Sequence, residues 1–232
     1  MTTSTSRACW HFAPKHERAR SRLLTAGKWA ALFALSLALS PVSFADELEE
    51  GRAALELADY RSAVTHFAHA AEAGNAAAQY ELATLYHEGD GVPRDLGRAI
   101  YWYTHAAEQG NTPAQYWLCV MHREGIGVPR NYSEAFYWCH RAAEKGHAAA
   151  MFAVGQFYFD GLGNGFIRDH LRAYIWFTLA DAQGDGDAQR MLKTLEEDMA
   201  PQQIAEARRL ASQWKPGERV PCSSNNPRAR FC

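Results

Sequence analysis

The chain is rich in side chains that bind metals or act as catalytic bases, with ten histidines among its 232 residues. His69 and His105 are 36 residues apart, and the same step leads next to Arg141. Histidines on helices that pack about 10 Å apart cannot both form Zn–N bonds of about 2.0–2.1 Å. The sequence has no His-Glu-x-x-His, Ser-x-x-Lys or nucleophile-elbow motif. We therefore expect no catalytic residue, no metal and no cofactor.

The cysteines are better candidates for disulfides than for metal ligands. Cys222 and Cys232 lie near the end of the chain, and Cys119 and Cys139 lie 20 residues apart in its middle. Neither pair has a C-x-x-C spacing or a nearby histidine pair. Each pair is a candidate disulfide, and the alternative for Cys119 and Cys139 is a pair of small buried thiols.

The N-terminal 45 residues resemble a targeting segment. Basic residues precede an apolar run from Trp29 to Leu39, and small residues follow at Ser43 and Ala45. This order predicts a signal peptide cleaved after Ala45, and hence export to the periplasm or secretion. A retained anchor is the weaker interpretation, because the run is short for a hydrocarbon layer of about 30 Å. We expect no integral membrane insertion after cleavage.

Charge argues against nucleic acid as a partner. Residues 1–45 carry six Lys/Arg and one Glu, a net charge of +5, whereas the whole chain carries −2. The remaining chain therefore carries −7. An acidic protein without a basic cluster is a poor ligand for nucleic acid or anionic lipid.

The elements that must position these residues are revealed by an internal repeat. Gly74, Gly110 and Gly146 are spaced by 36 residues, and Gly184 follows 38 residues later. The sequence between successive glycines is similar each time, and a period of 20 to 50 residues is typical of a solenoid. Each unit is expected to hold two antiparallel helices, here called helix A and helix B.

Helix boundaries are marked by residues with clear backbone roles. Helix A of the first unit is predicted over residues 77–87, with Gly89 as its left-handed C-terminal residue. Thr112 is predicted to cap the next helix A, with Pro113 at its first position and Gln115 at its third. The predicted N-caps of the helices B are Asp95, Asn131 and Asp169.

Small residues recur where the helices must approach closely. One helix A position holds Ala83, Cys119 and Gly155, and one helix B position holds Ala106, Ala142 and Ala180. Trp102, Trp138 and Trp176 form another series, which we interpret as core rather than as a ligand stack. The expected organisation is a signal peptide (1–45), an N-terminal capping helix pair (46–73), three repeats (74–110, 111–146 and 147–185), a C-terminal capping pair (186–214) and an irregular tail (215–232).

The repeated motif resembles that of Sel-1-like repeat proteins, a branch of the tetratricopeptide-like α/α solenoids. In the first unit the residues of this motif are Ala78, Leu82, Ala83, Tyr86, Gly89, Gly91, Val92, Asp95, Ala99, Trp102, Tyr103, Ala106, Ala107 and Gly110. The resemblance covers about residues 48–214. It implies an all-α solenoid with an adaptor or scaffold role, and similar exported bacterial proteins serve envelope assembly, signalling or host contact.

A recognition surface is expected on the helices A, which line most of the inner face in such solenoids. The nine positions predicted to face inward are Tyr80, Thr84, His87, Tyr116, Val120, Arg123, Phe152, Gln156 and Phe159. Aromatic residues beside variable polar ones suit a groove for a peptide. The alternative is that the aromatic series at positions 80, 116 and 152 is partly core.

The sequence thus favours a non-catalytic module that binds a protein or peptide on its concave face. A second hypothesis is a structural scaffold or assembly factor of an envelope complex that uses its convex side or tail. A third is a hydrolase acting on cell-wall material, which no residue pattern supports. Neither the identity of the partner nor the oligomeric state follows from the sequence.

Overall fold

The computed structural model describes residues 44–162, 167–218 and 220, and these residues form ten α-helices and no strand. The helices are α2 (Phe44–Glu56), α3 (Tyr60–Glu72), α4 (Ala76–Glu88), α5 (Leu96–Glu108), α6 (Thr112–Glu124), α7 (Tyr132–Glu144), α8 (Ala148–Asp160), α9 (His170–Ala182), α10 (Gly186–Asp198) and α11 (Pro201–Gln213). The predicted all-α fold is confirmed. Cys222, Cys232 and residues 1–43 of the predicted signal peptide lie outside the described residues.

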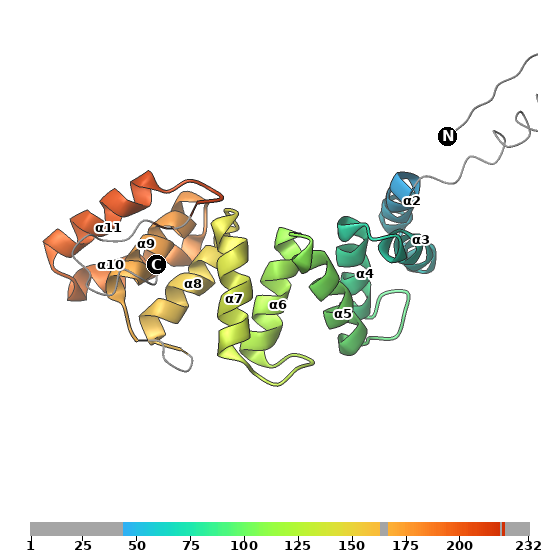
Figure 1. Ribbon diagram of the computed structural model, residues 1–232, viewed down its shortest axis with the longest axis horizontal. Coiled ribbons are helices and arrows are strands. Elements are labelled where there is room, and N and C mark those ends of the chain that lie inside the picture. Colours follow the sequence, from blue (N-terminus) through green and yellow to red (C-terminus); the bar gives the residue numbers. More distant parts are fainter. Residues whose placement is uncertain (1–43, 163–166, 219, 221–232) are drawn as a thin grey trace, which may run out of the picture. The chain divides into compact units, whose positions relative to one another are not determined.

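Consecutive helices pack against each other along the chain, as expected for a solenoid (Figure 1). Four helix pairs, α2–α3, α4–α5, α6–α7 and α8–α9, make the closest contacts, and each helix B also packs on the next helix A. The last two helices differ, because α10 and α11 both pack on α9. Within the described part of the chain, no helix combines the length and the apolarity needed to cross a membrane.

The helix ends follow the predicted backbone signals. Gly89 ends α4 with a φ of 87°, in the left-handed region that glycine adopts without a steric penalty. Asp95, Asn131 and Asp169 each accept a hydrogen bond at the start of their helix from a backbone N–H within the first turn. These side chains satisfy donors that a helix start otherwise leaves without a partner.

The predicted start of α6 was wrong by one residue. Asn111, not Thr112, is the N-cap, and its Oδ1 accepts from the backbone N–H of Ala114. Asn111 has the extended backbone of a cap, with ψ at 112°, whereas Thr112 is already helical. Gln115 is fully buried and its Nε2 donates to the carbonyl oxygen of Ala107. Its amide therefore joins two successive units and does not complete a capping box.

One crossing point recurs in every helix pair, at the eighth residue of each 13-residue helix. The facing residues are Gly51 and Phe67, Ala83 and Tyr103, Cys119 and Cys139, and Gly155 and Phe177. A Cβ atom added to Gly51 would lie 2.4 Å from the Phe67 ring, and one added to Gly155 would lie 2.6 Å from the Phe177 ring. Where α6 crosses α7, Cys119 and Cys139 form a disulfide, with Cα atoms 5.1 Å apart.

The remaining core is built from the series that repeat in the sequence. Trp138 and Trp176 are buried, and Trp102 is half-buried and packs against the core, which agrees with a packing role for these rings. The start of the C-terminal tail returns to the second unit, where the backbone N–H of Gly217 donates to the carbonyl oxygen of Glu144. The units are thus held by side-chain packing and by a few backbone contacts between them.

Candidate partner-binding surface

All nine residues predicted to face inward lie on α4, α6 and α8, at the fifth, ninth and twelfth positions of these helices. The spacing of four and three residues places each set of three on one helical face. Every one of the nine is half-buried, neither fully enclosed nor fully exposed. They therefore form a continuous row of positions whose side chains are partly open to solvent and partly fixed by packing.

The aromatic series at the fifth position is partly core, which was the alternative left open by the sequence. The Tyr80 ring lies 5.9 Å from the Tyr103 ring of the same helix pair, and Phe152 lies 5.4 Å from Phe177. Tyr116 instead stacks on His147, at 4.6 Å between ring centres. These contacts limit the rotation of the rings, which lowers the entropy that a partner would have to remove on binding.

The polar positions of the first unit are held by the same aromatic residues. Thr84 donates to the carbonyl oxygen of Tyr80, and its hydroxyl lies 3.2 Å from the hydroxyl of Tyr103. His87 meets the Trp117 ring edge-on at 5.0 Å. Burial lowers the pKa of His87, so this imidazole is neutral at pH 7.

Two of the nine residues join neighbouring units directly. Arg123 on α6 donates from Nη1 to Oε1 of Gln156 on α8, at 3.2 Å, and its Nε lies 2.8 Å from a carboxylate oxygen of Glu124. Phe159, one turn further along α8, stacks on His170 at 5.8 Å. The guanidinium of Arg123 is therefore held in place by a neutral amide on one side and by a carboxylate on the other.

A pocket of about 290 Å³ opens beside the Arg123–Gln156 pair. Its lining residues come from α6, α7, α8 and the loops between them: Arg123, Glu124, Arg130, Tyr132, Ala153, Gln156, Phe157, Asp160 and Leu162. Two guanidinium groups and two carboxylates surround an apolar floor. The pocket therefore suits a side chain with an apolar stem and a polar or charged tip.

Several residues at this surface were missed from the sequence. Arg130, Tyr132 and Asp160 line the pocket, and Trp117 packs against His87. The position of Trp117 holds Glu81 in the first unit and Ala153 in the third, so a search for repeated residue types passes over it. A search for residues that break the repeat would have found it.

The helices B carry a different set of exposed rings. Tyr101 on α5 and Tyr137 on α7 are 52% and 48% exposed and occupy the same position in successive units. The Tyr101 ring lies tilted against the His105 ring, with 4.3 Å between ring centres, and the hydroxyl of Tyr137 accepts from Arg141. In the third unit the position holds Ile175, which is buried. These tyrosines provide a matched comparison for the row on the helices A.

The fold and this surface define a solenoid of helix pairs with a row of half-buried side chains. The Sel1 repeat family model matches residues 76–111, 112–147 and 148–185. The chain is therefore a Sel1 repeat protein over these three units. Sel1 repeats are generally protein-interaction modules, and the family is generally non-catalytic.

Solved structures with the same repeats resemble the chain over most of its length. A Sel1 repeat protein from Oxalobacter formigenes is 28% identical, with a TM-score of 0.62 over 81% of this chain and 80% of that one. A protective antigen of uropathogenic Escherichia coli with an SLR fold is 26% identical, with a TM-score of 0.48 over 79% of this chain and 47% of that one. No curated protein matches the sequence.

Proposed function

We propose that the chain binds a protein partner along the row of half-buried residues on α4, α6 and α8, and that the partner binds as an extended segment. The observation that carries this proposal is the pocket beside Arg123 and Gln156, which lies on the row and joins two repeats. Partner residues that fill such a pocket are shielded from water, and such residues supply most of the affinity of an interface.

The chemistry of the pocket favours an acidic or amide side chain of the partner. The Arg123 guanidinium is already oriented by Gln156 and Glu124. Arg130 also lines the pocket, and its Nη1 lies 3.4 Å from the Tyr132 hydroxyl. A carboxylate of the partner would form a charge-assisted hydrogen bond with either guanidinium. Leu162, which is half-buried, provides apolar area for the stem of such a side chain.

We test the proposal by quantitative capture of partners from an envelope extract. The double variant Arg123→Glu/Phe159→Asp reverses the charge at the pocket and breaks the stacking on His170, and we expect it to lose more than nine-tenths of the captured partner. The matched control is Tyr101→Glu/Tyr137→Glu, which changes two exposed rings on the helices B. Circular dichroism and the urea midpoint establish that both variants are folded.

The result separates this proposal from the scaffold hypothesis. Equal recovery of every partner by the wild type and by Arg123→Glu/Phe159→Asp rejects the row as the binding surface. Loss of the partner by the tyrosine variant alone favours a scaffold that uses its other side. We expect no turnover of peptidoglycan fragments, and turnover would favour the hydrolase hypothesis instead.

Export is part of the same proposal, since it decides where the partner is found. The support comes from the sequence, in which a basic segment and an apolar run precede small residues at Ser43 and Ala45. N-terminal sequencing of the protein from fractionated cells should begin at Asp46 and place it outside the cytoplasm. A cytoplasmic protein that retains residues 1–45 would contradict export.

A further inference from the structure

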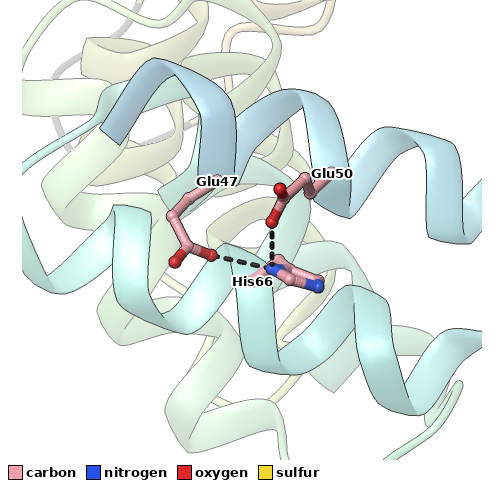
Figure 2. Close-up of side chains that lie close together, drawn as sticks. All are labelled: Glu47, Glu50 and His66. Atoms are coloured by element: carbon pink, nitrogen blue, oxygen red, sulfur yellow. Dashed lines mark hydrogen bonds and ion pairs between the residues drawn. The ribbon is translucent and has the colours of Figure 1, made fainter. Parts of the chain in front are cut away.

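The N-terminal helix pair brings imidazole and carboxylate groups together on one surface. Glu47 and Glu50 lie one turn apart on α2, and His66 lies on α3 with its Nδ1 between their side chains (Figure 2). This nitrogen is 2.7 Å from Oε2 of Glu47 and 3.2 Å from Oε2 of Glu50. His69, one turn from His66, has its Nδ1 3.5 Å from the other oxygen of Glu47. Two pairs of potential ligands thus face each other across two helices.

The backbone holds these side chains close together. Gly51 lies one residue after Glu50, at the crossing where any Cβ would overlap the Phe67 ring. The missing side chain allows α2 to approach α3 next to the cluster, and Phe67 itself is fully buried beside His66. Glu47 is only 15% exposed, whereas Glu50 is 56% exposed. The cluster is therefore largely enclosed at Glu47 and open to solvent at Glu50.

We propose that Glu47, Glu50 and His66, whose ligand atoms all lie within 4.8 Å of one another, bind a zinc ion. Ligand atoms at about 2.0–2.1 Å from a tetrahedral zinc lie about 3.3–3.4 Å from one another. The 3.2 Å distance from Nδ1 of His66 to Glu50 is close to that value, whereas the 2.7 Å distance to Glu47 must lengthen by about 0.6 Å.

The types of ligand select the ion. Calcium and magnesium take oxygen ligands, whereas imidazole nitrogen together with carboxylate oxygen suits zinc. The two carboxylates match the double positive charge of the ion. His69 and His105 lie on neighbouring units and are too far apart to share a zinc ion, whereas Glu47, Glu50 and His66 face each other across a single helix pair.

The experiment is a titration of the metal-free full chain with zinc chloride, in competition with a chromophoric zinc indicator at neutral pH. We expect one zinc ion per chain at the tightest site, and a dissociation constant at least tenfold higher in His66→Ala and in Glu50→Gln. Glu50 is the more exposed ligand, so its variant keeps the fold even if His66→Ala weakens the packing of α2. Zinc should also raise the thermal midpoint of the wild type and leave that of Glu50→Gln nearly unchanged.

The matched control is His105→Ala, which removes the histidine at the position of His69 in the next unit. His105 contacts the Tyr101 ring, and we expect its replacement to leave zinc affinity within twofold of the wild type. The proposal is overturned if His66→Ala and Glu50→Gln bind zinc as tightly as the wild type. It is also overturned if His105→Ala loses as much affinity as they do. Either result would leave the cluster as hydrogen-bonded ion pairs between two helices.

Discussion

The second Sel1 repeat and its neighbours fill the same crossing point in different ways. In the flanking repeats a small residue on helix A faces an aromatic ring on helix B, Ala83 with Tyr103 and Gly155 with Phe177. In the second repeat both residues are cysteines, and a disulfide joins them. All six residues are buried. The site therefore always holds one large group, which is either a ring or a covalent bridge between two small side chains.

The comparison shows what holds a helix pair together at this point. A ring buries apolar area and stabilises the folded state through contacts. A disulfide adds little area, and it stabilises mainly by restricting the unfolded chain. The second repeat therefore depends on an oxidising environment in a way that its neighbours do not. This dependence agrees with the proposed export of the chain.

Reduction of the disulfide should have the largest effect on the free energy of unfolding. The loop closed by Cys119 and Cys139 spans 20 residues, for which the entropic contribution is roughly 3 kcal/mol. We expect the free energy of unfolding to fall by about that amount after complete reduction in denaturant and refolding with reductant present. Urea unfolding followed by circular dichroism measures the difference. An unchanged urea midpoint would contradict a structural role for the bridge.

The control for this prediction converts the crossing of the second repeat into that of the third repeat. Cys119→Gly together with Cys139→Phe reproduces the pair formed by Gly155 and Phe177. We expect this double variant to unfold at a midpoint that reductant does not shift. A double variant that fails to fold would show that the two crossings are not equivalent spaces.

A smaller effect on stability is expected from a larger side chain at the crossing of the third repeat. Gly155→Ala places a Cβ 2.6 Å from the Phe177 ring, which is fully buried and has no space to move away. Overpacking of this kind costs about 1–3 kcal/mol. Gly186→Ala is the matched control, because a Cβ there meets no atom within 4 Å and alanine favours the helix. Urea midpoints should move in opposite directions for the two variants.

The crossing of the first repeat differs from that of the third by a methyl group on helix A and a hydroxyl group on helix B. Tyr103 has its hydroxyl 3.2 Å from that of Thr84, whereas phenylalanine occupies the same position in α3 and α9. Tyr103→Phe keeps the ring and removes the hydrogen bond, so we expect a loss of about 0.5–1.5 kcal/mol. Thr84→Val removes the other partner of the same pair. A double-mutant cycle that gives no coupling energy between Tyr103→Phe and Thr84→Val would contradict this hydrogen bond.

The smallest effect concerns the start of the third repeat and its dependence on pH. Helices α4 and α6 are capped by Asn75 and Asn111, but α8 is capped by His147, whose Nδ1 accepts from the backbone N–H of Ala150. Burial lowers the pKa of His147. Below an unfolded pKa of about 6.5 the unfolded chain binds a proton that the folded chain does not, so stability falls as the pH falls.

His147→Asn installs the cap of the other repeats and removes this proton. We expect the variant to lose less stability than the wild type between about pH 7.5 and about pH 5.5. Some dependence remains, because burial also lowers the pKa values of His87 and His122. Urea midpoints across this pH range measure the slope. Equal slopes for the two proteins would contradict the assignment.

Features that repeat in every unit were predictable from the sequence. The glycine that ends α4 and the N-caps of the helices B were assigned correctly, because φ sterics and hydrogen bonding to free N–H groups restrict each position to a few residue types. The cap of α6 was not, since Asn111 and Thr112 are both good capping residues and only the backbone conformation separates them.

Features that occur once were not predictable from the repeat. The connection between α2 and α3 is shorter than in later pairs, so an alignment by 36 residues relates α3 to α5 but does not relate α2 to α4, and it gives no sign that Glu47 faces His66. Arg130 and Asp160 have equivalents of the same charge in the other units, but Tyr132 replaces Leu96 of the first unit and is itself replaced by His170 in the third. A functional site in a repeat protein is therefore better sought where units differ.

The most direct test of the proposed binding surface is site-specific photo-crosslinking in living cells. A photo-reactive amino acid is placed at Gln156, beside the pocket, or at Tyr137, on the exposed side of α7. Binding along α4, α6 and α8 predicts that one partner is crosslinked from Gln156 and not from Tyr137, and that Arg123→Glu abolishes the product. A partner crosslinked from Tyr137 alone, with no product from Gln156, would contradict it.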